Sequence, residues 1–222
     1  MPNSSYHDYV IKNGELVGDW DGAYSASPDP WNQSATDHIQ DSRRVIAKSW
    51  AKRLTDSFEN QTRVIEVGCG FGHLTHALSN QGMCSLGIDI STIAIKKAQS
   101  LYPNDDFQVG RFSDWNIYDV FQPDIFILSE ITWYVLNELP TWLERLHQYS
   151  LRDRPTYLIH LLATYPKGVQ KYGLEYFSDL ESILDYFKLN YMEYGKIENP
   201  PPGGSDVQQQ NLRIGTYFIA KI

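Results

Sequence analysis

Three closely spaced glycines constrain this chain more than any other feature of its sequence. Gly68, Gly70 and Gly72 follow the apolar run 63–67 and precede a segment, 73–81, with helical character. A tight strand-to-helix turn needs glycine, because the backbone takes unusual dihedral angles there and a Cβ would block a ligand lying against it. Asp89 ends the next apolar run, where a carboxylate can bind two ribose hydroxyls. The order strand, glycine turn, helix, strand and acid predicts a site for a ribose-containing cofactor.

The spacing of the glycines departs from the dinucleotide-binding pattern. That pattern is Gly-x-Gly-x-x-Gly, whereas this chain has Gly-x-Gly-x-Gly. Glu66 lies inside the preceding strand, two residues before the first glycine. Both features count against a nicotinamide oxidoreductase, which is the rival enzyme class on a similar sheet.

Apolar runs and amphipathic segments alternate along the chain after residue 58. Such alternation predicts an α/β domain with helices on both faces of a mostly parallel sheet. The two closing strands flank a Pro- and Gly-rich loop at 199–205 and are expected to be antiparallel. We expect strands at 63–67, 84–89, 107–109, 124–129, 156–162, 191–197 and 212–222, and helices at 35–58, 73–81, 91–102, 139–150 and 174–185.

The first helix and the segment before it form a separate region, 1–58. Residues 1–34 are rich in turn residues and predict an irregular arm. In the helix 35–58, the spacing of Ile39, Ile46, Trp50 and Leu54 places them on one face. We expect 1–58 to act as a lid and acceptor-recognition region and 59–222 to form the cofactor-binding domain.

The arm is both acidic and aromatic. Residues 1–42 carry seven acids and one base, a net charge of −6, whereas the whole chain carries −8. One reading is a solvated arm; the other is a lid that favours a neutral or cationic acceptor over a phosphorylated one. Trp20, Tyr24 and Trp31 are expected to contact the acceptor, since exposed rings in a plain tail would be a solubility liability.

Composition excludes several classes of protein. The 222 residues suit one domain, and no apolar run is long enough to span a membrane. No basic segment followed by an apolar run is visible at the start, so we expect a cytoplasmic location. Two cysteines make neither a disulfide framework nor a four-ligand metal site, and the six histidines show no metal-ligand spacing, so we expect no metal. The acidic balance argues against a nucleic-acid partner. The chain is expected to be a monomer or a homodimer.

At the glycine loop the sequence becomes similar to a known family. Glu66-Val-Gly-Cys-Gly-Phe-Gly72, together with Asp89, resembles the signature of class I methyltransferases that use S-adenosylmethionine. The resemblance covers about 62–165. It implies one Rossmann-like domain with a mostly parallel seven-stranded sheet, helices on both faces and an antiparallel C-terminal hairpin.

The resemblance also implies roles for single residues. Glu66 would shape the loop and reach the methionine ammonium, Asp89 would bind the ribose, and Ile90 would pack on the adenine. The loop after the third strand, Arg111 to Asp114, would lie on the adenine side. The implied cofactor-binding residues are Glu66, Gly68, Cys69, Gly70, Gly72, Asp89, Ile90, Phe112, Ser113 and Ser129.

A second stretch points to the acceptor side of the site. Ser129-Glu130-Ile-Thr-Trp-Tyr134 resembles the Ser-Glu-x-x-Tyr-Tyr stretch of nodulation-type N-methyltransferases, with Trp133 in place of a tyrosine. Asp29-Pro-Trp31 resembles an element of their N-terminal lid. Glu130, Tyr134 and His160 are the catalytic candidates, and Trp133 is a further acceptor contact. Each catalytic candidate has an alternative: Glu130 as a backbone hydrogen-bond partner, Tyr134 as a core aromatic, and His160 as a buried core histidine.

The expected function is transfer of a methyl group from S-adenosylmethionine to an N or O atom of a small molecule. A saccharide or amino-sugar is the first acceptor to test, and a natural product or other small amine is the alternative. A cofactor-binding scaffold without chemistry is the alternative from another class. Methylation of protein or RNA is disfavoured by the acidity of the chain and by the lack of an added recognition domain.

Overall fold

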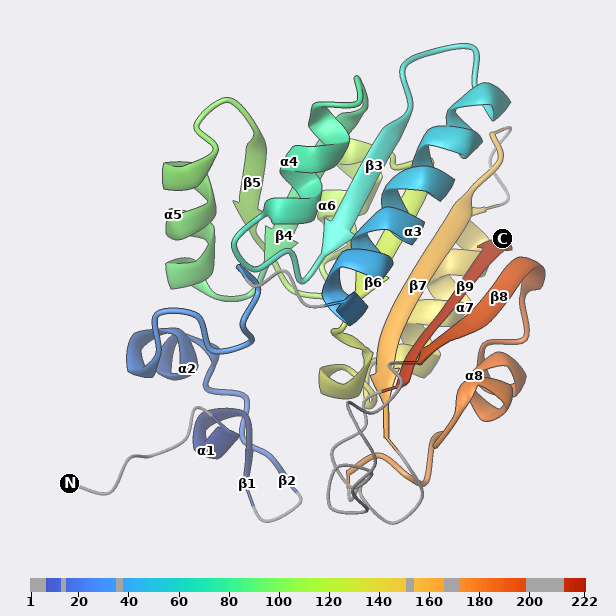
Figure 1. Cartoon of the computed structure of the whole chain (residues 1–222). Helices are drawn as coiled ribbons and strands as arrows, with labels where there is room; N and C mark the ends of the chain where they lie inside the picture. Colours follow the sequence, from blue (N-terminus) through green and yellow to red (C-terminus); the bar gives the residue numbers. More distant parts are fainter. Residues whose placement is uncertain (1–6, 13–14, 35–37, 151–153, 166–171, 199–213) are drawn as a thin grey trace.

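A seven-stranded mixed sheet forms the centre of the protein (Figure 1). The computed structural model describes residues 7–12, 15–34, 38–150, 154–165, 172–198 and 214–222. The strand order is β5-β4-β3-β6-β7-β9-β8, and β9 pairs antiparallel with both neighbours. The predicted α/β class and the antiparallel closing strands are confirmed. The strands are β3 (Arg63–Val67), β4 (Cys84–Asp89), β5 (Asp106–Val109), β6 (Ile125–Ser129), β7 (Tyr157–Thr164), β8 (Asn190–Glu198) and β9 (Ile214–Lys221).

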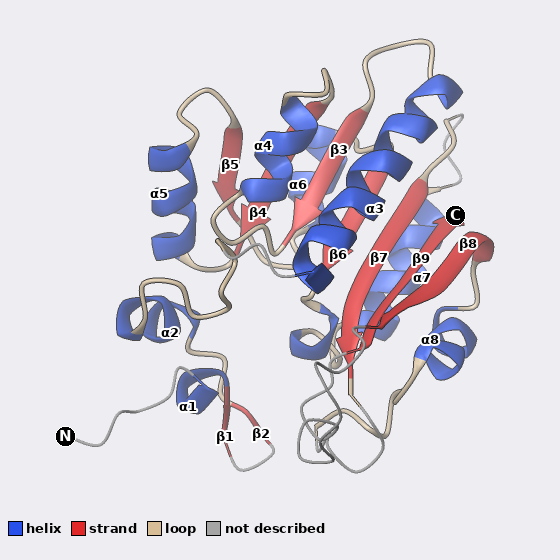
Figure 2. Cartoon of the chain, viewed as in Figure 1, coloured by secondary structure: helices blue, strands red, loops and turns tan. Residues whose placement is uncertain are grey.

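Helices cover both faces of the sheet (Figure 2). The face with α3 and α4 buries Val64, Ile125 and Ile159, and the face with α6, α7 and α8 buries Phe126 and Leu158. Because successive side chains of a strand point to opposite faces, central strands that are covered on both faces are apolar almost throughout. The helices are α3 (His38–Leu54), α4 (His73–Ser79), α5 (Thr92–Leu101), α6 (Trp115–Phe121), α7 (Leu139–Tyr149) and α8 (Leu180–Phe187).

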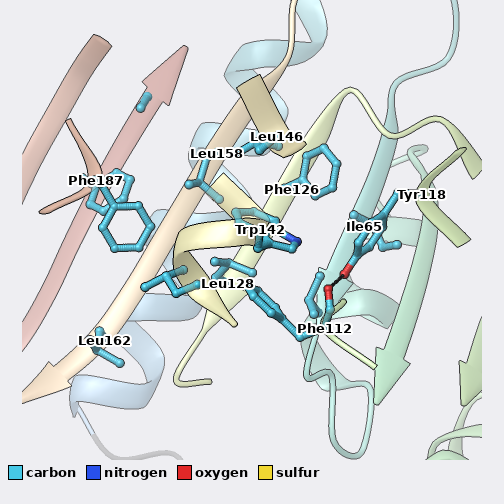
Figure 3. Packing of buried hydrophobic residues seen from close by; sticks show 14 of the residues in the cluster. Ile65, Phe112, Tyr118, Phe126, Leu128, Trp142, Leu146, Leu158, Leu162 and Phe187 are labelled. Carbon is cyan, nitrogen blue, oxygen red and sulfur yellow. Dashed lines mark hydrogen bonds between the residues drawn. The ribbon is translucent and has the colours of Figure 1, made fainter. Parts of the chain in front are cut away.

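The larger core lies between the sheet and helices α6 to α8 (Figure 3). Trp142 of α7 is fully buried and stacks on Phe112, with ring centroids 4.8 Å apart. The hydroxyl of Tyr118 donates to the Phe112 carbonyl at 2.7 Å. These contacts fix the loop after β5, and therefore hold one end of the candidate site in place.

The arm contains more regular structure than its composition predicts. It forms α1 (His7–Val10), the short strands β1 (Ile11–Lys12) and β2 (Glu15–Leu16), and α2 (Trp20–Ala26). The sequence did not predict these elements, because they are short and lie among many turn residues. The Asp19 side chain caps α2 by accepting from the Gly22 N–H at 2.9 Å. This segment lies beyond the arrowheads of β3, β4 and β5, at the carboxyl edge of the parallel strands (Figure 1).

Helix α3 buries part of the predicted face, at Leu54, together with three residues that were not predicted. Arg43, Ala47, Ala51 and Leu54 are buried, whereas Ile46 and Trp50 are only half-buried at its edge. Small alanines let the helix approach the sheet closely, which rotates the larger residues to the flank. The side chain of Ile39 and residues 35–37 lie outside the described residues.

Two other helices differ from the sequence prediction. Helix α8 begins at Leu180 rather than near 174, because Asp179 and Ser182 form a capping box there. Helix α6 was not expected; it is a short helix whose Tyr118 is buried against the sheet. The loop 199–205 and the first residues of the expected last strand lie outside the described residues. Among the residues described, no helix has both the length and the apolar character needed to cross a bilayer.

Candidate active site

A cavity of about 440 Å³ lies at the carboxyl edge of β3, β4 and β6. Open α/β sheets place ligands at this edge, and the volume is typical of a small-molecule site. The body of the domain supplies one wall and the arm supplies the opposite one. The residues discussed below that line the cavity are Trp20, Tyr24, Trp31, Gln33, Arg43, Arg44, Glu66, Gly68, Cys69, His73, Asp89, Ile90, Gly110, Arg111, Phe112, Ser129, Glu130, Ile131, Trp133, Tyr134 and Glu138.

The glycine turn has the backbone that its sequence predicts. Gly68, Gly70 and Gly72 have φ angles of 75°, 53° and 76°. A Cβ at Gly68 would lie 2.0 Å from Ile131, and one at Gly72 would lie 2.3 Å from Phe107. Gly68 and Cys69 line the cavity, whereas Gly70 and Gly72 lie outside its lining. The last two glycines are therefore required by close packing in this conformation.

Asp89 ties the glycine turn to the start of α5. One carboxylate oxygen accepts from the Gly70 N–H at 2.9 Å, and the other accepts from the Ser91 N–H at 2.8 Å. Burial raises the pKa of Asp89, and these two N–H groups oppose that shift. Ile90 beside it is 39% exposed. Asp89 and Ile90 thus both line the cavity next to the glycine turn, and their roles toward a ribose and an adenine stay predictions.

Glu66 lies beneath the glycine turn. One of its oxygens accepts from both the N–H and the hydroxyl of Thr75, at 2.8 and 2.5 Å. Burial raises the pKa of Glu66 to about 7, while these bonds and the Arg44 guanidinium oppose the shift. Glu66 is therefore a buried carboxyl group whose charge a nearby ligand cation would stabilise.

The loop after β5 is only partly in the cavity. Gly110, Arg111 and Phe112 line it, while Ser113 is exposed and lies outside the lining. The Arg111 N–H donates to Asp114 at 2.8 Å, which shapes the turn. Of the two residues expected on the adenine side, Phe112 thus lines the cavity and Ser113 does not.

Three aromatic rings from distant segments form the opposite wall. The rings of Trp20 and Tyr134 lie 5.0 Å apart, edge to face, and those of Trp20 and Trp31 lie 6.2 Å apart. The indole N–H of Trp31 donates to the Tyr134 hydroxyl at 3.1 Å. Tyr24 packs on Trp31 and on Phe71 of the glycine turn. The arm aromatics chosen from the sequence therefore all reach the cavity.

Gln33 joins this aromatic wall to the glycine turn. Its amide oxygen accepts from the Phe71 N–H, and its amide nitrogen donates to the Tyr24 hydroxyl, both at 2.9 Å. Arg44 donates to the Gln33 carbonyl, and Asp29 accepts from the Gln33 N–H at 2.7 Å. A Cβ on Gly70 would meet the Gln33 side chain at 2.2 Å. The arm is thus fastened directly to the cofactor side.

Glu130 pairs with a buried arginine. Its carboxylate lies 2.5 Å from the Arg43 guanidinium of α3, with side chains 33% and 3% exposed respectively. Glu130 has a φ of 65°, and its N–H donates to the Leu161 carbonyl at 2.9 Å. A non-glycine residue in the left-handed region at a strand end is a strained conformation, often found at functional sites.

His160 does not line the cavity. It is completely buried, between the rings of Phe187 and Phe218, and its Nε2 is 2.8 Å from the Thr132 hydroxyl. Burial lowers its pKa to about 3, so the ring is neutral. The structure therefore places His160 in the core, beneath the turn that carries Trp133 and Tyr134. A histidine in an apolar strand can be a catalytic residue or a buried core residue, and the sequence alone does not distinguish the two roles.

Trp133 and Ser129 both reach the cavity from the segment after β6. The Trp133 indole N–H donates to the Ala163 carbonyl at 2.7 Å, which fixes the ring against Phe177. Ser129 is half-buried at the end of the strand. Trp133 is thus a rigid part of the cavity lining.

The acids of the arm act mainly on neighbouring protein groups. Asp21 accepts from the hydroxyls of Ser91 and Thr92 at 2.6 and 2.9 Å, and Asp29 holds the Gln33 turn. The cavity itself carries the cations Arg43, Arg44 and Arg111 as well as acids. The charge of the arm therefore does not by itself set the charge of the site. In the part of the chain that the structure describes, no group of three or more His, Cys, Asp or Glu side chains is placed to hold a metal.

Arg43, Arg44 and Gln33 were missed by the sequence interpretation. Arg43 falls within the buried stripe of α3, four residues before Ala47 and eight before Ala51. An arginine inside a buried helical stripe is a usable signal, because charged side chains are seldom buried without a partner. Gln33 carries no such pattern, since its contacts depend on the fold of the arm.

Comparison with known proteins gives a consistent result. Residues 65–153 match the family model described as a methyltransferase domain. The chain is 33% identical over 95 residues to "Putative methyltransferase 235L" of Invertebrate iridescent virus 6, a match that spans 40% of this chain and 35% of that protein. The chain thus corresponds to about a third of that relative's length.

Solved structures share the fold at low identity. A structure from work on conversion of a disulfide bond into a thioacetal group during echinomycin biosynthesis has a TM-score of 0.60 at 16% identity, covering 90% of this chain and 89% of that one. The N-methyltransferase NodS from Bradyrhizobium japonicum WM9, in complex with S-adenosyl-L-homocysteine, has a TM-score of 0.57 at 13% identity, covering 88% and 93%. At these identities the likeness concerns the fold.

Proposed function

We propose that this protein, which contains a class I methyltransferase domain of Rossmann-like fold, transfers a methyl group from S-adenosylmethionine to an N or O atom of a small molecule. One observation carries the proposal: a single cavity joins the Asp89 and glycine-turn side to the aromatic wall of the arm. A cofactor and an acceptor can therefore meet within one enclosed space, as methyl transfer requires.

The residues on the cofactor side suit the chemical groups of S-adenosylmethionine. Asp89 offers carboxylate oxygens to ribose hydroxyls, and Ile90 and Phe112 offer apolar surface to an adenine. Glu66 and Arg44 are an acid and a cation placed near each other, which suits the ammonium and carboxylate of the methionine part. When bound, the cofactor supplies a methyl group already activated by its sulfonium.

The protein then has to position the acceptor and exclude water. The arm supplies Trp20 and Trp31, whose rings and that of Tyr134 form a rigid apolar wall. Residues 1–58 are thus proposed as the lid and acceptor-recognition region. In-line displacement depends on alignment of the reacting atoms, so this wall would contribute mainly through orientation.

The aromatic lining of the cavity and the resemblance to nodulation-type N-methyltransferases support a small-molecule acceptor. An amino-sugar or other saccharide is the first candidate, and a small amine of natural-product type is the second. We place the protein in a reducing compartment, the cytoplasm, because Cys69 and Cys84 form no disulfide. We propose a monomer or homodimer as its oligomeric state.

Two measurements test the proposal. Calorimetric titration should show binding of S-adenosylmethionine and none of a nicotinamide dinucleotide. A screen of amino-sugars, sugars and amines should then release S-adenosylhomocysteine. Binding of the cofactor without product from any acceptor would favour a silent scaffold, and absence of cofactor binding would refute the proposal.

The arm is tested separately by Trp31→Ala. Loss of this ring removes the bond to Tyr134 and opens the aromatic wall, so turnover should fall by about 10²-fold while cofactor affinity changes only a few-fold. The substitution Trp50→Ala, which removes a half-buried indole that donates to Glu193 outside the cavity, controls for general loss of an indole. Full activity in Trp31→Ala would show that the arm is merely structural.

A further inference from the structure

The carboxylate at the acceptor end of the cavity is already committed to a buried cation. Glu130 is paired with Arg43, whose side chain is only 3% exposed. If Glu130 took up a proton, Arg43 would be left as a buried charge without compensation, which is strongly unfavourable. The pair therefore holds Glu130 as an anion and makes it a poor acceptor of a proton from a substrate.

The backbone reinforces this arrangement. Glu130 is held at a φ of 65°, and its N–H is bound to the Leu161 carbonyl of the neighbouring strand. The backbone at the end of β6 is therefore fixed at the residue that pairs with Arg43. Glu130 is thus suited to a fixed role as an anion in the lining of the cavity.

The neighbouring side chains are also poorly suited to take a proton. The Tyr134 hydroxyl accepts from Trp31, and burial raises the pKa of Tyr24. Both ring nitrogens of His73 have partners, Tyr102 at 2.6 Å and Ser34 at 3.4 Å, and burial lowers its pKa. Glu138, at the N-cap of α7, is exposed, so its carboxylate is solvated.

The lack of a suitable base among these side chains affects a hydroxyl acceptor and an amine acceptor differently. A hydroxyl must lose its proton as the new bond forms, and a positioned base commonly accelerates such a step by about 10²–10⁴. An uncharged amine already has a free electron pair and needs no base. Among the described residues at the acceptor end, none is both placed and free to act as a base, which favours the amine.

We propose that the acceptor is an amine, methylated on nitrogen after it reaches the cavity in its uncharged form; this deepens, and rests on, the proposed function. The amine electron pair forms the N–C bond while the S–C bond breaks and its electron pair stays on sulfur. The positive charge moves from sulfur to nitrogen, and the product ammonium later loses a proton to water.

Two features at the acceptor end of the cavity would stabilise the charged ammonium product. Glu130 lines the cavity on the segment after β6, and Arg43 keeps it ionised. The rings of Trp20, Trp31 and Tyr134 also line the cavity, and the face of an aromatic ring attracts a cation. A neutral ether product would draw on neither interaction.

Matched acceptors test the inference. Glucosamine against glucose, and benzylamine against benzyl alcohol, differ at the reacting atom. With the full chain and S-adenosylmethionine, each amine should release S-adenosylhomocysteine at least ~10²-fold faster than its alcohol. With amines of different pKa, the rising limb of the pH profile should move with the amine. Calorimetry on protein loaded with S-adenosylhomocysteine should likewise show tighter binding of benzylamine than of benzyl alcohol.

Variants of the ion pair separate positioning from base catalysis. Glu130→Gln should act mainly on the KM of the amine, with kcat reduced by less than about tenfold, whereas loss of a base would lower kcat by ~10²–10⁴. Because this change strands Arg43, the double variant Arg43→Met with Glu130→Gln keeps the test valid if the single variant unfolds. Lys52→Met, on the exposed side of the same helix, is the matched control.

Several results would overturn the inference. They are a cofactor-loaded protein that converts none of the amines, an alcohol methylated as fast as its amine, and a kcat loss of ~10² or more in both Glu130 variants. Failure to bind S-adenosylmethionine at all would instead refute the proposed function itself.

Discussion

The two walls of the cavity are built in different ways. The cofactor wall, as we propose it, comes from one continuous stretch of chain, from Glu66 of β3 to Phe112 after β5. The acceptor wall joins the arm, α3 and the segment after β6. Its Trp31 and Tyr134, which share a hydrogen bond, are 103 residues apart in the sequence.

The difference explains why one wall is recognisable and the other is not. A wall made by successive elements is fixed by local backbone requirements, so its residues keep characteristic spacings. A wall made by distant segments has no spacing to keep, and each segment can change its side chains independently. A fold can therefore keep one cofactor and change its acceptor.

The largest effect is expected where the two walls touch. Gly68→Ala places a Cβ 2.0 Å from Ile131 at a φ of 75°, so backbone strain and overpacking together should lower the free energy of unfolding by about 3–5 kcal/mol. Gly82→Ala is the control, because Gly82 has a φ of 86° and no atom within 4 Å of its Cβ position; it should cost about 1–2 kcal/mol. Urea unfolding measures both. Equal losses would show that contact between the walls contributes little.

The next effect concerns the buried acid of the cofactor wall. Burial raises the pKa of Glu66 to about 7 from its ordinary 4.5. The associated stability is complete below about pH 4.5 and is lost as the pH rises through about 7, a decrease of about 3 kcal/mol in the free energy of unfolding. Glu66→Gln should remove this decrease.

The measurement is the difference between wild type and Glu66→Gln in urea unfolding across that pH range. The difference is needed because His160, whose pKa is lowered to about 3, has the opposite effect. Its contribution is present above about pH 6.5 and is lost as the pH falls, in both proteins alike. A pH-independent difference between the two proteins would contradict the buried-acid interpretation.

Asp89→Ala should weaken binding of the cofactor, because it changes the cofactor wall and leaves the acceptor wall intact. The cofactor loses its carboxylate partner, so its affinity should fall by about 1.5–3 kcal/mol in calorimetric titration. Asp119→Ala, on an exposed acid of α6 that pairs with Arg145, should leave the affinity unchanged. An Asp89 variant with full affinity would refute the placement of the ribose.

The smallest effect is expected at the link between the walls. Gln33→Ala removes its bonds to Phe71 and Tyr24 and should lower the free energy of unfolding by about 1–2 kcal/mol. If the link couples the walls, cofactor affinity and the KM of the acceptor should both worsen, each by less than about tenfold. Gln148→Ala, on the exposed surface of α7, is the control. A change in only one of the two quantities would show that the walls act independently.

The sequence by itself determined the parts of the protein that depend on local rules. Apolar runs such as 124–129 predicted the central strands, because parallel strands covered on both faces must be apolar. The glycine spacing and Asp89 predicted the cofactor wall, because positive φ angles and a strand-end acid are set by neighbouring residues. Trp20, Tyr24 and Trp31 line the cavity, because large rings in a turn-rich arm need a surface to cover, and their contact with the acceptor stays a prediction.

Only the tertiary structure decided how the acceptor wall is assembled. It paired Glu130 with Arg43, placed Gln33 over Gly70, and moved His160 into the core. It also turned α3 so that two alanines, an arginine and Leu54 face inward, while Ile46 and Trp50 lie half-buried at the edge. These outcomes depend on which distant surfaces meet and on how closely they pack, and no local pattern of residues carries that information.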